Sequence, residues 1–142
     1  MTTRVEFHTG VADAVDFACR LLRKACHQGV RVLVRAPGPV LGRVDRGLWT
    51  QVERDFLPHL RVTTANAASS QARRSPIWLT DGEPPPGSPP VLVNLGAEMP
   101  ASLDGLQRII EIVSAEPADA AAGRDRWKRY RAAGLTVQHH DA

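Results

Sequence analysis

Three segments of the chain have the sequence features of helices. Apolar side chains recur every three or four positions over residues 11–27 and again over residues 40–52, which is the period of an amphipathic helix. A third helix is predicted over residues 117–133, because Pro117 stands at its start and Gly134 just past its end. These three segments are the predicted helices of the chain.

Short apolar runs rich in β-branched residues separate these helices and are typical of buried strands. They cover residues 4–8, 30–34, 77–80, 91–95 and 109–113. The order begins strand, helix, strand, helix, and a helical crossover joins parallel strands. We therefore predict an α/β fold: a single three-layer, Rossmann-like domain over residues 1–142 with a mostly parallel central sheet. Residues 30–34 and 91–95 should be central strands, because both are apolar on both faces.

Three further segments are not expected to form regular elements. Residues 61–74 are rich in Thr, Ala, Ser and Asn, which favours a loop. Residues 81–90 (DGEPPPGSPP) contain five prolines, which exclude a helix or an interior strand and predict an exposed loop. Residues 135–142 are predicted to be a frayed polar C-terminal tail.

Composition and charge place the chain among ordinary soluble proteins. Hydrophobic residues make up 43% and charged residues 23%, and the apolar runs are too short for a membrane helix. A charged N-terminal segment argues against a signal peptide. We therefore expect a cytoplasmic protein whose two cysteines, Cys19 and Cys26, stay reduced and pack in the core. The net charge of +3 is modest, so the position of the charges matters more than their sum.

Motifs for catalysis, cofactors or metals are not found in the sequence. Gly10 follows the first strand, but it stands alone rather than in the glycine-rich pattern that a dinucleotide needs, so it is interpreted as a turn. His139 and His140 are neighbours whose side chains point in opposite directions in an extended chain, which makes a poor chelate. No serine or cysteine lies in a nucleophile-elbow pattern. We predict no catalytic site, no cofactor and no metal.

The segment 124–131 (RDRWKRYR) is the most informative stretch of the chain. On a helix, Arg124, Lys128 and Arg131 share one face, and Trp127 lies at its edge. One interpretation is a solvated, charged helix with a half-buried Trp. The other is a docking site for an acidic ligand with an apolar end, because Arg grips carboxylates and an aromatic ring can border an apolar pocket.

A second aromatic cluster pairs Trp49 with Phe56, seven residues further on. Such a pair is usually part of a core. The alternative is an exposed patch for a protein partner, since aromatic residues are enriched at interface hot spots.

These two segments resemble the chi subunit family of bacterial DNA polymerase III. Leu48-Trp49 with residues 56–59 (FLPH) is similar to the family's Leu-Trp, spacer, Phe-Val-Pro-His segment. Residues 124–134 (RDRWKRYRAAG) are similar to its Arg-Glu-Arg-Tyr-Lys-Ala-Tyr-Arg-Val-Ala-Gly helix. The likeness extends over the whole chain and weakens over residues 61–90.

The resemblance implies a non-catalytic accessory subunit of the clamp-loader assembly, in a holoenzyme whose nucleotidyltransferase activity resides in another subunit. It implies binding of the acidic C-terminal tail of the single-stranded-DNA-binding protein, which ends in Ile-Pro-Phe. The psi subunit would join the chain to the clamp loader, and DNA would be reached only indirectly, with no membrane involved.

The family's site residues can be carried over to matching positions. The implied tail site is Val113, Arg124, Trp127, Lys128 and Arg131, and the implied psi contact is Trp49 and Phe56. Ala120 stands where the best-known member has a lysine. The acidic part of the tail would therefore be held less tightly, or by Arg126 or Arg129 instead.

Two other functions stay open from the sequence. A Rossmann-like sheet also suits a nucleotide-dependent enzyme, although the phosphate loop is missing. The basic last helix could instead bind single-stranded nucleic acid directly, and that hypothesis predicts equally tight binding of bare DNA and of an acidic peptide.

Overall fold

The computed structural model describes residues 3–50 and 57–141. The strands are β1 (Arg4–Val11), β2 (Val32–Arg35), β3 (His59–Arg61), β4 (Ile77–Thr80), β5 (Val91–Asn94), β6 (Arg108–Ser114) and β7 (Val137–Asp141). The helices are α1 (Ala14–His27), α2 (Gly38–Thr50), α3 (Ser70–Arg74) and α4 (Pro117–Ala132).

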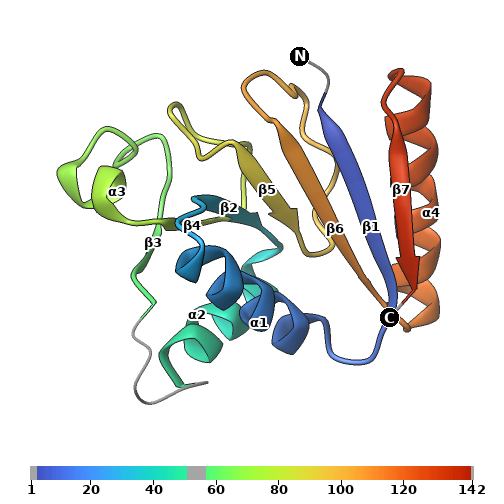
Figure 1. Cartoon of the computed structure of the whole chain (residues 1–142), viewed down its shortest axis with the longest axis horizontal. Helices are drawn as coiled ribbons and strands as arrows, with labels where there is room; N and C mark the ends of the chain where they lie inside the picture. Colours follow the sequence, from blue (N-terminus) through green and yellow to red (C-terminus); the bar gives the residue numbers. More distant parts are fainter. Residues whose placement is uncertain (1–2, 51–56, 142) are drawn as a thin grey trace.

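All strands of the described residues pair in parallel in one sheet, in the order β3-β4-β2-β5-β6-β1-β7 (Figure 1). The predicted α/β class with a parallel sheet is confirmed. Strand β2 lies between β4 and β5, and β5 lies between β2 and β6, so both strands expected at the centre are there. Their boundaries differ from the prediction by one or two residues, and β2 begins at Val32 rather than at residue 30.

Helices cover both faces of this sheet, which gives three layers. Helices α1 and α2 pack on one face, and α4 packs on the other, near the β7 edge (Figure 1). Successive residues of one strand serve opposite layers: Val32 and Val34 contact the α1 and α2 side, while Leu33 belongs to the core on the other side. This period of two is the reason why the central strands are apolar at every position.

Two of the three segments expected to be irregular contain regular structure. Residues 135–142 are not a frayed tail, because β7 pairs with β1 along Val5–Thr9 and forms one edge of the sheet. The expected loop at 61–74 contains the short helix α3, and β3 was not predicted. An edge strand has one side open to water, so the polar residues of β7 are tolerated there without an apolar pattern.

Gly10, which was interpreted as a turn into a helix, does not turn the chain into a helix. It lies with φ +67° at a bulge in β1.

The proline-rich segment 81–90 is a loop, as predicted, and a buried arginine ties it to the sheet. Arg35 ends β2, donates from Nε to the Gly82 carbonyl at 2.7 Å and pairs with Glu83 at 3.0 Å. Glu83 in turn accepts a bond from the backbone N–H of Ala101 at 2.6 Å. The prolines thus lie in a fixed crossover between β4 and β5. Within the described ranges, no helix has the length and apolar character that a membrane span requires.

Candidate functional site

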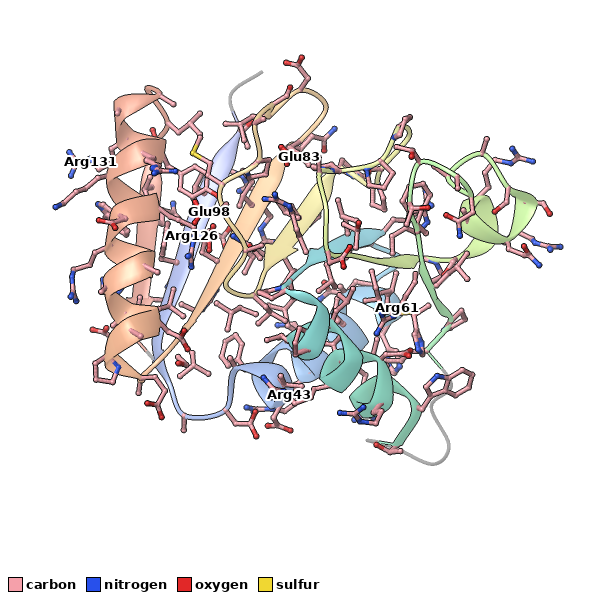
Figure 2. The ribbon with its side chains drawn as sticks, turned by 180° about the vertical axis from the view of Figure 1, so that it is seen from behind. Arg43, Arg61, Glu83, Glu98, Arg126 and Arg131 are labelled. Carbon is pink, nitrogen blue, oxygen red and sulfur yellow. The ribbon has the colours of Figure 1, made fainter. Side chains whose placement is uncertain are left out.

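Helix α4 presents most of its side chains to solvent. Pro117 opens the helix, and Gly134 follows it with φ +85°, as the sequence predicts. Its fully buried residues are few: Gly123, Arg126 and Tyr130. Figure 2 shows Arg131 projecting outward from the helix, whereas Arg126 points inward to the sheet. A helix with so few apolar contacts needs another means of attachment.

A buried polar network supplies that attachment. Glu111, in the middle of β6, is 0% exposed and accepts from Nε of Arg126 at 3.0 Å. Its second carboxylate oxygen accepts from the Tyr130 hydroxyl at 2.7 Å and from the Asn94 amide at 2.8 Å. Asn94 also exchanges two bonds with the backbone of Ala97. Every charge in the network therefore has a partner, which is the condition for burying it.

Burial decides the ionisation behaviour of this network. Loss of water raises the pKa of Glu111, and the nearby Arg126 charge with the Asn94 and Tyr130 hydrogen bonds lowers it only part of the way back. Burial and the Glu111 carboxylate both raise the pKa of the Tyr130 hydroxyl, so this group stays a donor. The network fixes α4 to β6 and leaves the charged side of the helix free for other contacts.

A pocket of about 450 Å³ lies where α4 crosses β1, β6 and β7. Its walls are mainly apolar: Val113 of β6, Phe7 of β1, and Gly123 and Trp127 of α4. The rings of Phe7 and Trp127 are 5.1 Å apart and tilted by 59°. At Gly123 the helix backbone approaches Val113 so closely that a Cβ atom would meet both Val113 γ-carbons at 3.0 Å. The pocket is therefore shaped by a close helix–strand contact.

Two cations stand on the α4 side of this pocket. Arg124 and Lys128 both line it, both are exposed, and neither forms an ion pair with a described residue. Four of the five residues carried over for the tail site, Val113, Arg124, Trp127 and Lys128, thus come together here. Arg131 does not line the pocket, and its charge contributes only from the outer side of the helix.

The alternative cations proposed for the acidic peptide do not lie at the pocket. Arg126 is buried and committed to Glu111, so the expectation that it could replace the missing lysine is wrong. Arg129 pairs with Glu98 at 3.4 Å and is also absent from the pocket lining. Ala120 does line the pocket. It offers a small apolar surface there in place of a charge.

The second surface predicted from the sequence consists of Trp49 and Phe56, and its residue in the described part of the chain, Trp49, is exposed. Trp49, near the end of α2, is 57% exposed, and its ring meets His59 edge-on at 5.1 Å. His59 is itself fixed, because one ring nitrogen lies 2.7 Å from the Leu57 carbonyl and the other 2.7 Å from the Asp45 carboxylate. The core interpretation of Trp49 is therefore wrong. Phe56 lies outside the described residues.

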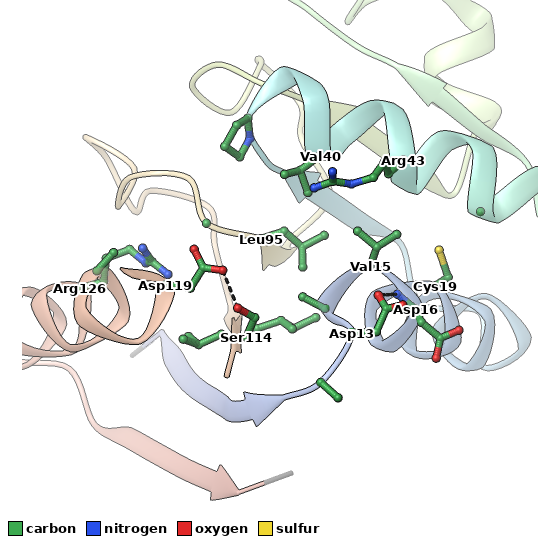
Figure 3. Close-up of a pocket in the computed structure, with 18 of the residues that line it drawn as sticks. Asp13, Val15, Asp16, Cys19, Val40, Arg43, Leu95, Ser114, Asp119 and Arg126 are labelled. Carbon is green, nitrogen blue, oxygen red and sulfur yellow. Dashed lines mark hydrogen bonds between the residues drawn. The ribbon is translucent and has the colours of Figure 1, made fainter. Parts of the chain in front are cut away.

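A larger cavity of about 660 Å³ opens at the carboxyl ends of the strands, where α/β proteins often bind nucleotides (Figure 3). Its lining includes Asp13 and Asp16 at the start of α1 and Asp119 of α4, which accepts from the Ser114 hydroxyl at 2.5 Å. Two arginines line the same cavity: Arg43 of α2, and Arg126, which pairs with Glu111. The cavity therefore carries charges of both signs and no excess of positive charge for a phosphate or an acidic peptide. No three His, Cys, Asp or Glu side chains in the described parts of the chain gather to hold a metal.

Some of these site residues were not found from the sequence. Glu111 interrupts the apolar run 109–113, and a lone carboxylate inside such a run is a signal that a buried cation must face it. Thr9 and His139 were missed because they reach the pocket only through the pairing of β1 with β7. Nothing in the local sequence of either segment indicates that pairing.

Fold and pocket together define an α/β domain with an apolar pocket, rimmed by two basic residues, at one edge of its sheet. A sequence model of the family described as DNA polymerase III chi subunit, HolC, matches residues 1–138. The DNA polymerase III subunit chi of Pseudomonas aeruginosa is 32% identical over 143 aligned positions, which cover 97% of this chain and 96% of the relative. The chain belongs to the DNA polymerase III chi subunit family and is therefore an accessory subunit of the replicative polymerase.

Proposed function

We propose that the pocket beside α4 binds the acidic C-terminal tail of the single-stranded-DNA-binding protein. The tail's terminal Phe ring would enter the apolar space between Val113 and Trp127. Arg124 would hold its carboxylate, and Lys128 would attract the aspartates that precede it. The observation that carries this proposal is the combination of an apolar pocket with two unpaired cations on one rim.

The energetics favour a peptide of this kind. A carboxylate held by Arg in a partly desolvated site gains a charge-assisted hydrogen bond, and such bonds contribute about 1.5–3 kcal/mol. An aromatic side chain leaving water adds the hydrophobic term for its buried area. Neither contribution alone distinguishes this tail from other acidic or apolar segments. Specificity comes from placing both at a fixed separation.

Titration with the acidic peptide tests the tail site. Arg124→Ala should weaken binding by about 2 kcal/mol, because the terminal carboxylate would be left partly desolvated without a partner. Lys128→Ala should cost less and mainly reduce the salt dependence. Arg129→Ala is the matched control, since it removes the same charge from the same helix outside the pocket. Unchanged affinity in Arg124→Ala, or equal binding of a scrambled peptide, would contradict the assignment.

We further propose that the exposed Trp49 surface contacts the psi subunit and thereby links the chain to the clamp loader. An exposed indole at the end of a helix is a typical interface anchor. Trp49→Ala should weaken co-purification with psi while leaving the unfolding midpoint close to that of the wild type, because the ring is more than half exposed. A large loss of stability with unchanged psi binding would return Trp49 to a structural role.

The same proposal assigns the chain no catalysis of its own. The alternative of a nucleotide-dependent enzyme predicts thermal stabilisation by a nucleotide, and the missing phosphate loop argues against it. The alternative of direct DNA binding predicts that a bare single strand binds as tightly as the peptide. Both predictions are checked with the protein used for the titration.

A further inference from the structure

The pocket beside α4 has a second wall that comes from the edge of the sheet. Thr9 of β1 and His139 of β7 line it opposite the helix. Their backbones are brought together because β7 pairs with β1, with His139 next to Phe7 in the register. The last strand of the chain therefore contributes directly to the site.

His139 is held in place by its neighbours. Its Nε2 lies 2.6 Å from the Thr9 hydroxyl oxygen, and the same hydroxyl lies 3.2 Å from the Asp141 carboxylate. Nε2 also lies 3.3 Å from the Asp141 carboxylate, so Thr9 and Asp141 both contact the same edge of the ring. The imidazole thus has a defined orientation, with Nε2 toward Thr9 and Asp141.

This orientation sets the imidazole against the indole of Trp127. The two rings are 5.7 Å apart and nearly perpendicular, at 84°. Trp127 also meets Phe7, so three rings from α4, β1 and β7 surround the same space. Edge-to-face contacts of this kind favour an aromatic guest over an aliphatic one.

We propose that His139, oriented by Thr9, is a further peptide-contacting residue that sets the preference of the pocket for a terminal aromatic side chain. This inference rests on the proposed function, because it concerns the same pocket. It adds that β7 contributes His139 to the wall of the binding site. The charged groups that face His139 are Asp141 on its own strand and Arg124 and Lys128 across the pocket.

The neighbouring histidine provides a matched control. His140 projects to the opposite side of β7 and stacks on His8 with ring centroids 5.0 Å apart. Replacing either histidine by alanine removes one imidazole from the same edge strand. Only His139 faces the pocket. Any general weakening of β7 should therefore appear in both variants. A loss of peptide contacts should appear only in His139→Ala.

The experiment titrates the wild type, His139→Ala and His140→Ala with the tail peptide ending in Phe and with a peptide ending in Ala. His139→Ala should weaken binding of the Phe-ended peptide about three- to tenfold, which corresponds to one aromatic contact. His140→Ala should stay within about twofold, and the Ala-ended peptide should not distinguish the variants. His139→Gln keeps a polar side chain but no ring, so it should lose as much affinity for the Phe-ended peptide as His139→Ala. It replaces His139→Ala in the experiment if His139→Ala does not fold.

The outcomes separate this inference from the proposed function. If the wild type does not bind the peptide, the proposed function itself fails. If the wild type binds and Arg124→Ala weakens binding, but His139→Ala equals His140→Ala, the tail site stands and the role of His139 is overturned. An equal effect of His139→Ala on both peptides would also overturn it, because the contact would then not concern the terminal ring.

Discussion

Two glutamate–arginine pairs lie on opposite faces of the sheet and behave in opposite ways. Glu111 and Arg126 lie under α4 with side chains 0% and 6% exposed, and burial raises the pKa of the carboxyl. Glu6 and Arg108 join β1 to β6 on the α1 side with side chains 11% and 39% exposed, and the Arg108 hydrogen bond lowers the pKa of Glu6. The same chemical pair therefore reports two different environments.

The comparison extends to the helices on each face. On the α1 and α2 side the core is a continuous apolar cluster, and the polar pair lies at its margin. On the α4 side a charged network replaces part of the apolar contact. A helix held in this way can expose most of its surface, and α4 uses that surface for the cations of the pocket. Attachment by a few strong contacts thus leaves most of the surface of α4 exposed.

Removing one partner of the buried pair should have the largest effect on stability. Arg126→Ala leaves the Glu111 carboxylate in the interior with only neutral donors. The free energy of unfolding should fall by about 3–5 kcal/mol. Without the cation, the folded pKa of Glu111 is raised further, so folding takes up a proton and stability falls as pH rises above the ordinary value of 4.5. Urea unfolding at pH 5.5 and 8 should therefore show the greater loss at pH 8.

A double variant checks the cause of that loss. Arg126→Met with Glu111→Gln removes both charges and keeps similar volumes, so it should recover a large part of the stability lost in Arg126→Ala. If the double variant is as unstable as the single one, packing rather than an unpaired charge holds α4 in place.

The apolar face should respond differently to a deletion of similar size. Leu22 of α1 is fully buried in the α1 and α2 core. Leu22→Ala should cost about 2–4 kcal/mol through lost transfer energy and a residual cavity. This loss should be the same at pH 5.5 and 8, because no ionisable group is uncovered. A clear pH dependence would show that the two faces are not independent.

Close helix contacts offer a smaller test on both faces. A Cβ atom at Gly123 of α4 would meet both γ-carbons of Val113 at 3.0 Å, and one at Gly47 of α2 would meet Cys19 Sγ at 2.8 Å. Every valine rotamer keeps a γ-carbon at one of these two positions, whereas a single Sγ can rotate away.

Gly123→Ala should therefore destabilise the protein by about 1–2 kcal/mol, after the gain in helix propensity is subtracted. Gly47→Ala should cost less, and thermal unfolding of the two variants side by side gives the comparison. A larger loss in Gly47→Ala would place the tighter contact between α1 and α2 instead.

The sequence predicted one of these two faces better than the other. The α1 and α2 face follows the rules of periodicity, since its helices carry apolar stripes and its strands are β-branched. The α4 face depends on contacts among Glu111, Arg126 and Asn94, which lie on three different elements. These contacts form only in the folded chain, so local sequence patterns do not predict them. Strand β7 was missed for a related reason: its residues QHHD have no apolar alternation, and only its pairing with β1 defines it. Of the residues expected for the tail site, Arg124, Trp127 and Lys128 share one side of α4 through helical spacing. Val113 of β6 joins them only through tertiary packing, and Arg131 does not line the pocket.

The smallest expected effect concerns the Glu6–Arg108 pair, which is partly solvated through Arg108, and its pH dependence sharpens the comparison. Glu6 accepts from Nε and Nη2 of Arg108 at 2.8 and 2.9 Å, and this contact holds the folded pKa of Glu6 below its unfolded value. Its stabilisation is fully present above the unfolded pKa and is lost as pH falls through the folded one. Glu6→Gln should therefore cost about 1 kcal/mol or less at pH 7, because Arg108 is partly solvated. The difference from the wild type should shrink below pH 4 and in high salt. Urea unfolding from pH 7 to pH 3 measures it, and a difference that grows on acidification would mean that Glu6, like Glu111, is governed by burial.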